Sequence, residues 1–358
     1  MRVPGVTVLL SGLLLGCGTF DDPSTVKDLR ILAVGAEPSE VILNVATDAD
    51  LTRAAIPPLF LSPLIANPIG LPVTVTISVC ANDPAAASPP NNGTDPTGYP
   101  AGGARATVGS ALCDGDPTQV LLVDGAEVSM DPVTPLPVTL TPAWLLGAYQ
   151  RDVFIGPDGK LHGGFDLGMP VVFQITAQAG NEKVIAVKRV LFWLSPLRGD
   201  QTPNRTPQIP GLRAYDRRDE ATAEPLPDAI QSLDSGTTLE VGPGGLWIEP
   251  VAAAAPTLTA EAETYVTATL DRLTGQVTPI DVEESLTYTF YASAGTFAPQ
   301  QTSSHPPPGI TPQGRLHIES KYKPPAGGGA AEITLWIVVR DERGGASWQT
   351  RSLRMAAP

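Results

Sequence analysis

The chain has 358 residues, of which 42% are hydrophobic and 17% are charged, and its formal net charge is −14. This hydrophobic share supports a folded core and argues against wholesale disorder, while the acidic balance repels a phosphate backbone and argues against nucleic-acid binding. The 38 prolines and 35 glycines disfavour a helical protein, because both residues interrupt helix interiors.

The first 16 residues have the pattern of an export signal. Arg2 precedes an uncharged apolar run from Val6 to Leu15, which is shorter than the roughly 20 residues that a membrane-spanning helix needs. The run ends in Leu14-Leu15-Gly16-Cys17. This resembles the lipobox of bacterial lipoproteins, in which an aliphatic residue and then a small residue precede the cysteine that accepts the lipid. We predict a lipoprotein signal peptide over 1–16 and a palmitate-type anchor on Cys17; the alternative is an ordinary signal peptide with an incidental cysteine.

Residues 17–27 are predicted to form a short flexible tether between the lipid and the folded part. Several acyl chains on Cys17 would bury enough methylene groups for stable membrane anchoring. The residue after this cysteine is Gly18 and not aspartate, which by analogy with enteric sorting favours the outer membrane.

Eight runs rich in β-branched and aliphatic residues follow, and most are bounded by proline, glycine, asparagine or aspartate, as is typical of strands. They lie at 29–34, 40–45, 58–64, 73–80, 119–123, 137–140, 171–179 and 183–194. One helix start interrupts them, where Thr141 is the N-cap and Pro142 the first helical residue. Gly147 and Gly156 predict that this helix is short. We predict one β-sandwich over 28–197.

Two further cysteines, Cys80 and Cys113, would lie in an oxidising compartment after export, where such a pair is expected to be bridged. Within 73–80 the apolar residues occupy odd positions, and Cys80 shares the even positions with threonine and serine. The bridge is therefore expected to pin the loop 81–112 at a strand end and not to join two sheets through the core. The alternative is a pair of free thiols; a metal site is disfavoured because no histidine is near in sequence.

Residues 198–236 lack the strand pattern and are predicted to be a polar, proline-containing linker, parts of which could pack as an extended arm. Seven more strand-like runs then lie at 238–241, 246–250, 264–270, 286–293, 316–321, 332–340 and 348–355. Apolar and polar positions alternate in 286–291, and the turn 341–345 carries the glycines of a hairpin. Short strands at near-regular spacing predict a second, Ig-like sandwich over 237–358. The predicted fold class is all-β, with two Ig-like β-sandwich domains in tandem after the signal peptide.

Five segments spread from the start of the folded part almost to the C-terminus resemble a family of myxobacterial envelope lipoproteins. They are 27–33, 36–41, 204–207, 284–295 and 335–345. The sequence departs from the expected pattern at Tyr288 and Phe290, where tryptophan would be expected. The resemblance implies Ig-like β domains and carries over no activity, because the shared segments have the character of strands and turns.

Candidate chemical groups are few. The three histidines, His162, His305 and His317, lie in separate segments and not at a metal-ligand spacing. Triads assemble in space, but no Gly-x-Ser-x-Gly motif raises the expectation of one. We predict no catalytic residue, no metal and no cofactor.

Acidic pairs and tryptophans allow weaker alternatives. Calcium binding is conceivable at 48–50, 114–116 or 283–284, but a turn-forming role is preferred for 114–116 because of its central glycine. The five tryptophans, at 144, 193, 247, 336 and 348, could stack on glycan rings, although those inside strand runs are expected to pack in the core or at a sheet edge.

The sequence therefore predicts a non-enzymatic, lipid-anchored protein of the cell envelope with a binding, adhesion or structural role. Its expected partners are the membrane, through the lipid, and an envelope protein or glycan, with the loop 81–112 as the preferred contact surface. Two alternatives stay open: an accessory lipoprotein of an export or motility assembly, and an envelope polysaccharide hydrolase with paired carboxylates.

Overall fold

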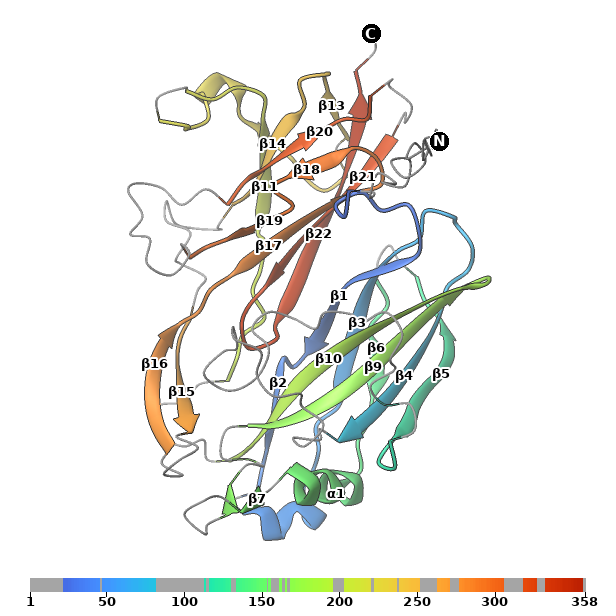
Figure 1. The fold of residues 1–358 in the computed structure, drawn as a ribbon, viewed down its shortest axis with the longest axis vertical. Coiled ribbons are helices and arrows are strands. Elements are labelled where there is room, and N and C mark those ends of the chain that lie inside the picture. Colours follow the sequence, from blue (N-terminus) through green and yellow to red (C-terminus); the bar gives the residue numbers. More distant parts are fainter. Residues whose placement is uncertain are drawn as a thin grey trace, which may run out of the picture.

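In the computed structural model, strands from the two halves of the chain form two β-sandwiches that lie against each other (Figure 1). The structure describes residues 22–356 except 46, 82–112, 114–115, 130–132, 153, 156–160, 163–164, 166–167, 196–202, 220–221, 237, 252–262, 271–276, 306–317 and 327–331. Cys17 and the predicted signal peptide lie outside these residues.

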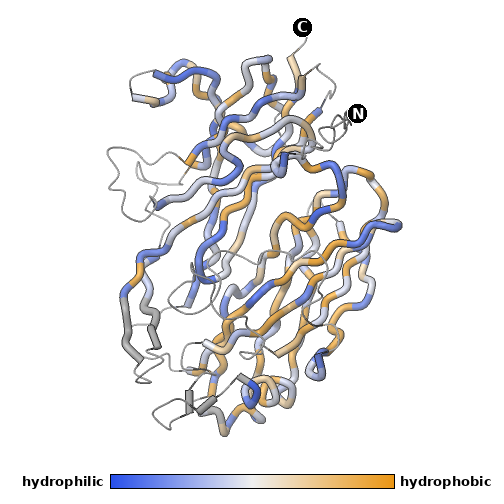
Figure 2. Tube along the Cα trace, viewed as in Figure 1, coloured by the Kyte–Doolittle hydropathy of each residue, from blue (hydrophilic) through white to orange (hydrophobic). Residues whose placement is uncertain are grey.

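The first sandwich packs a three-stranded sheet against a five-stranded sheet. The smaller sheet has the order β1 (Arg30–Glu37), β3 (Leu59–Ala66) and β6 (Leu136–Val138). The larger has the order β2 (Glu40–Leu43), β10 (Glu182–Leu194), β9 (Met169–Ala179), β4 (Thr74–Ala81) and β5 (Val120–Glu127). One continuous core lies between them, with Leu61 of β3 and Phe173 of β9 among its fully buried side chains. Figure 2 shows the hydrophobic residues concentrated along these strands.

Helix α1 (Pro142–Asp152) closes one end of this sandwich, together with the 3-10 helix η1 (Asp48–Arg53) and the short pair β7 (Phe154–Ile155) and β8 (Leu161–His162). The predicted N-cap is confirmed, because the Thr141 hydroxyl accepts a hydrogen bond from the Trp144 amide at 3.2 Å. The helix is longer than its glycine suggested and continues through Gly147 for 11 residues. Buried Leu145 and Ala148 hold it against the core, which offsets the low helix propensity of glycine.

The second sandwich contains two five-stranded sheets. One has the order β12 (Gln231–Ser232), β11 (Gly211–Tyr215), β14 (Leu246–Val251), β20 (Ser320–Lys323) and β18 (Thr296–Ala298). The other has the order β13 (Thr238–Val241), β22 (Ala346–Met355), β21 (Glu332–Arg340), β17 (Thr287–Ala292) and β19 (Gln301–Ser303). A separate ribbon is formed by β15 (Thr264–Leu270) and β16 (Val277–Glu283), and η3 (Pro227–Ala229) is a single turn. Phe290, Phe297 and Tyr322 pack together in the core, with ring centroids 5.3–5.4 Å apart.

The segment predicted to be the linker, 198–236, differs from that prediction. It contains β11 and β12, and β11 pairs with β14 inside the sheet. Leu212 and Ala214 of β11 alternate into the core and are almost completely buried. The second sandwich thus begins by Gly211, before the predicted start at residue 237.

The predicted tether also differs, because its last residues pack as an arm on the second sandwich. Ser24, Thr25 and Val26 are buried. The Val26 amide donates to the Ala292 carbonyl at 2.8 Å, and the Ala292 amide donates to the Ser24 carbonyl at 2.9 Å. The Ser24 hydroxyl also accepts from the Phe297 amide at 2.8 Å. We call residues 24–26 the N-terminal arm.

The two sandwiches bury a shared apolar interface. Leu32 and Leu64 of the first sandwich and Val338 of the second are almost completely buried there, and Trp336 and Trp348 pack against them. Val338 and Trp336 occupy the positions of β21 that alternate away from the core of their own sandwich. The outer face of this sheet is thus covered by the first sandwich and not by water.

Candidate functional site

The predicted disulfide is present and pins a loop at a strand end. Cys80, the penultimate residue of β4, is bonded to Cys113, with their Cα atoms 5.5 Å apart. The bridge packs on Val172 and Val187, on the opposite face of the sheet from the main core. The Cys113 amide donates to the Gln174 side-chain oxygen at 2.9 Å, which ties the end of the loop to β9.

The residues just after Cys113 form a fixed base for this loop. Asp116 accepts hydrogen bonds from the Thr118 amide at 2.7 Å, from the Thr118 hydroxyl at 2.6 Å and from the Arg151 guanidinium at 2.7 Å. Partial burial opposes ionisation, but these hydrogen bonds and the Arg151 charge outweigh it and hold the pKa of Asp116 below its usual value. Asp116 is therefore an ionised structural residue, in agreement with the turn-forming role predicted for it.

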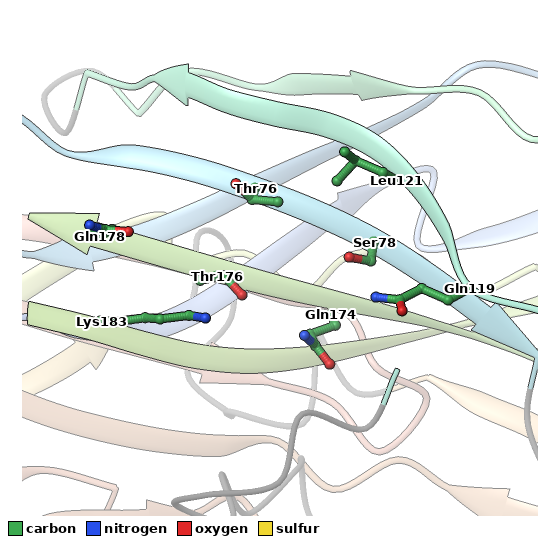
Figure 3. A pocket seen from close by; sticks show the side chains of 8 residues that line it. All are labelled: Thr76, Ser78, Gln119, Leu121, Gln174, Thr176, Gln178 and Lys183. Carbon is green, nitrogen blue, oxygen red and sulfur yellow. The ribbon is translucent and has the colours of Figure 1, made fainter. Parts of the chain in front are cut away.

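Next to the disulfide, the outer side of β4, β5, β9 and β10 carries a hollow of about 520 Å³ (Figure 3). It is lined by Thr76, Ser78, Gln119, Leu121, Gln174, Thr176, Gln178 and Lys183, and we call this set the polar face. Alternation produces it, because intervening residues such as Ile77 and Ile175 point into the core. The strand register places Thr76 opposite Thr176 and Ser78 opposite Gln174.

The polar face offers hydrogen-bonding groups and little charge. Lys183 is the one ionisable member of the set, and the others carry hydroxyls, amides and one leucine, although Ser78 and Gln174 are themselves buried. Gln119, Gln178 and Lys183 are exposed, and Leu121 is 54% exposed. Such a surface can exchange several neutral hydrogen bonds with a bound molecule, and the sequence analysis did not identify it as a site. The polar residues of this face could have been recognised from the alternation of apolar and polar positions in 73–80 and 171–179.

A buried polar network joins the two sandwiches, and Asn204 lies at its centre. Its amide donates to the Glu40 carboxylate at 2.9 Å, and its carbonyl accepts from the Ser39 hydroxyl at 2.9 Å. Its side-chain amide donates to Asp341 at 3.1 Å. Asp341 also accepts from the Gly345 amide at 2.6 Å. Burial raises the pKa of both carboxyls, Glu40 and Asp341.

Lys188 of β10 extends this network toward the hairpin between β21 and β22. Its ammonium donates to the Gly344 carbonyl. Burial lowers the pKa of Lys188 to about 8, against the opposing effect of the Asp341 charge. Lys188 is 6% exposed, so its charge is retained in the interface by Asp341 and the backbone.

A second group of charges lies around Arg343, in the same hairpin. Its guanidinium pairs with Glu263, lies 3.5 Å from Glu284 and stacks over the Tyr265 ring at 4.6 Å. Glu284 is 1% exposed. Burial and the nearby Asp341 charge raise the pKa of Glu284 to about 7, although Arg343 acts in the opposite direction. Perturbed carboxyls of this kind are frequent at functional sites, but the Glu284 carboxylate is almost completely buried and lies beside Arg343.

The histidines of the described residues lie in separate segments of the structure. His305 lies 3.3 Å from the Ser304 hydroxyl and 3.7 Å from Glu283, while His162 is in β8 and His317 lies outside the described residues. Within the part of the chain that the structure describes, no group of three or more His, Cys, Asp or Glu is placed to hold a metal ion.

The tryptophans are engaged within the protein. Trp336 and Trp348 pack in the interface, and Trp144 donates to the Thr118 carbonyl at 2.8 Å. Arg218 lies 3.4 Å above the Trp247 ring, and Trp193 contacts Gly168. The expectation that tryptophans inside strand runs pack within the protein is confirmed for Trp336.

No family model and no curated protein sequence matches the chain. Among solved structures, it is similar to Escherichia coli alpha-2-macroglobulin activated by porcine elastase, with 11% identity over 93% of this chain and 22% of that one, at a TM-score of 0.18. It is similar to the protocadherin gammaB7 EC3-6 cis-dimer structure, with 14% identity over 93% and 52% of the chains, at a TM-score of 0.18. The chain spans no more than about half of either structure. Scores of this size carry no argument, so the tandem-sandwich fold is assigned from the sheets themselves.

No helix in the described ranges combines the length and apolar character needed to cross a bilayer.

Proposed function

We propose that this chain is a bacterial cell-envelope lipoprotein, held in the outer membrane by a lipid on Cys17, that acts as a non-enzymatic binding module. In this proposal both domains are Ig-like, and the chain belongs with the myxobacterial envelope lipoproteins that its sequence resembles. The strand order supports the Ig-like assignment. In the second sandwich, the strands β11-β14-β20-β18 of one sheet follow the ABED order and the strands β22-β21-β17 of the other follow the GFC order. Three further strands, β12, β13 and β19, are added at the edges of these sheets.

The observation that carries the binding role is the polar face. Four of its side chains, those of Thr76, Ser78, Gln174 and Thr176, lie on the paired strands β4 and β9, where the register fixes their spacing. A rigid scaffold that presents groups at fixed positions loses little conformational entropy when it binds. The disulfide beside it fixes both ends of the loop 81–112 at the same surface.

The chemistry of the polar face favours a glycan as the ligand. A polysaccharide presents many hydroxyl groups that donate and accept hydrogen bonds, and neutral amides and hydroxyls complement them without a desolvated charge. Leu121 adds an exposed apolar contact for the faces of sugar rings. The hydrolase alternative gains less support, because Glu40, Asp341 and Glu284 are buried in structural contacts.

Binding is tested with the full mature chain and purified envelope polysaccharide fractions in a calorimetric titration. The double substitution Gln119→Ala and Gln178→Ala removes two exposed amides from the polar face, and we expect about a 10-fold loss of affinity at roughly 0.5–1.5 kcal/mol per hydrogen bond. The matched control is Gln208→Ala and Gln231→Ala, which removes two exposed amides elsewhere. Equal affinity of the two double variants, or no binding by the parent, would refute the proposal.

The anchor is tested separately by intact-mass analysis and cell fractionation. Lipidation should add acyl mass at Cys17 and place the protein in the outer-membrane fraction. Cys17→Ser should remove both effects. A parent chain of unmodified mass would contradict the anchor and leave the polar face unaffected.

A second function is favoured by the edge strand β5, in which Val120 is 41% and Leu121 is 54% exposed. Exposed edge strands accept an added strand from a partner chain. An accessory role in an envelope assembly would use this edge. Val120→Lys, at a residue outside the polar face, should then abolish cross-linking to a protein partner and leave glycan affinity less affected than the paired glutamine substitution does.

A further inference from the structure

The turn between β3 and β4 is an exposed, uncharged projection. Its residues 68–72 read Pro-Ile-Gly-Leu-Pro, and all five are exposed, with Ile69 at 44% and Leu71 at 46%. In Figure 2 hydrophobic colour reaches this turn, which connects β3 to β4 at the edge of the first sandwich. Two large apolar side chains within three residues, with no charge between them, form a small exposed apolar patch at the tip of the turn.

The turn is held in one shape. The Asn67 side chain donates to the Leu71 carbonyl at 2.5 Å, and the Gly70 amide donates to the Asn67 carbonyl at 3.2 Å. Gly70 has a φ of +68°, which a glycine adopts without strain. With a proline on each side, the turn presents its two apolar side chains without a large ordering cost.

The N-terminal arm leads into the same end of the first sandwich, where β1 begins. Arg30, the first residue of β1, pairs with Ala66, the last residue of β3, directly before the turn. The Leu29 amide donates at 2.9 Å to Glu182, at the start of β10. The Leu71 side chain lies close beside Gly180 in the hairpin between β9 and β10, where it occupies the space that a Cβ at Gly180 would need. The arm, the start of β1 and the turn lie on the same side of the molecule (Figure 1).

The length of chain before the arm limits where a bilayer can be. Seven residue steps separate Cys17 from buried Ser24, which is at most about 25 Å when fully extended. A lipid on Cys17 would therefore hold the arm, and the edge of the first sandwich beside it, close to the membrane surface.

We propose that the turn at residues 68–72 inserts Ile69 and Leu71 into the interfacial region of the bilayer that carries the lipid on Cys17. The inference rests on the proposed lipid anchor. The turn acts as a second contact, and it fixes how the protein is oriented on the membrane. When the end of the first sandwich that carries this turn faces the bilayer, helix α1 at the opposite end lies away from the membrane.

The test uses the lipidated full-length mature protein in vesicles of phosphatidylethanolamine and phosphatidylglycerol with brominated acyl chains. Ile69→Trp adds an indole at the tip of the turn. The control, Ile230→Trp, adds one at a residue of similar exposure, 38%, beside η3 of the second sandwich. The signal from the five native tryptophans is subtracted with the parent protein.

We expect bromine to reduce the fluorescence added at position 69 about twofold or more, because an inserted side chain lies roughly 5–10 Å into the boundary region, and to leave that at position 230 unchanged. Equal quenching at both positions, or quenching at neither, in protein whose lipid mass is confirmed would overturn the membrane-facing turn and leave the anchor intact. A parent without acyl mass would instead overturn the anchor and with it this inference.

Discussion

The charge cluster around Arg343 can be tested through Glu284, which is buried next to Arg343 and Asp341 in the second sandwich. Its pKa rises from an ordinary value of 4.5 to about 7, chiefly through burial. In the unfolded chain the carboxyl loses its proton near pH 4.5, and in the folded protein it keeps it to about pH 7. Between these values the folded state binds more protons than the unfolded state, so the free energy of unfolding falls as pH rises.

The magnitude follows from the size of the shift. A change from 4.5 to about 7, at 1.36 kcal/mol per pKa unit, corresponds to about 3 kcal/mol. Glu284→Gln carries no charge at any pH and avoids this loss. Relative to the parent, the variant should therefore gain up to about 3 kcal/mol of stability between pH 5 and pH 8.

The assay is urea unfolding at pH 5 and pH 8, followed by fluorescence and circular dichroism. The effect is the change in the stability difference between variant and parent, so that any loss of the Arg343 contact that does not depend on pH cancels. The control is Glu283→Gln, since this neighbouring side chain is 59% exposed. If both variants show the same pH dependence, the assignment of a buried, protonated Glu284 is refuted.

Three further predictions follow from named contacts. Cys80→Ser with Cys113→Ser should lower the free energy of unfolding by about 3.5–4 kcal/mol for a closure of 33 residues, measured by urea titration; an unchanged midpoint would contradict it. Ser24→Ala leaves the buried Phe297 amide without its acceptor, so it should cost about 1–3 kcal/mol and speed proteolytic cleavage near the arm, whereas Ser195→Ala should not. Asp116→Asn should destabilise the loop base at pH 7 and have no effect well below the usual carboxyl pKa. The reason is that the lowered pKa of Asp116 contributes stability at higher pH, and this stability is lost on acidification. Equal destabilisation at both pH values would argue against this prediction.

Much of the strand pattern could be predicted, because each strand carries its own alternation. The run predicted at 332–340 coincides with β21, and that at 183–194 with β10 to within one residue. Leu286, Tyr288 and Phe290 face the core as their spacing indicated. Such local patterns need no knowledge of distant residues.

The buried network was missed because its members are far apart in the chain. Glu40, Lys188, Asn204 and Asp341 come from four segments, and no short spacing connects them. A weak signal existed in Lys188, which interrupts the apolar run of β10. Trp336 and Val338 were a second signal, since large apolar residues on the outer side of a strand indicate that another surface covers it.

The segment containing β11 was missed for a different reason. Prolines and charges surround five residues, Gly211–Tyr215, that form a strand in the sheet beside β14. Tertiary pairing outweighs the local composition here. The arm was likewise predicted to be flexible from its polar sequence, although its partner is the backbone of residues 292–297.

The N-terminal arm is synthesised long before the strands with which it pairs. Ser24 and Phe297 are 273 positions apart, so at roughly 5–20 residues per second they leave the ribosome about 15–55 seconds apart. Throughout that interval the arm has no partner to pair with, and under the proposed anchoring the enzymes that attach the lipid would act before the arm is held in place. The arm can pair only after β17 and β18 have been synthesised. The order of synthesis therefore places any modification of the N-terminal segment before the arm packs on the second sandwich.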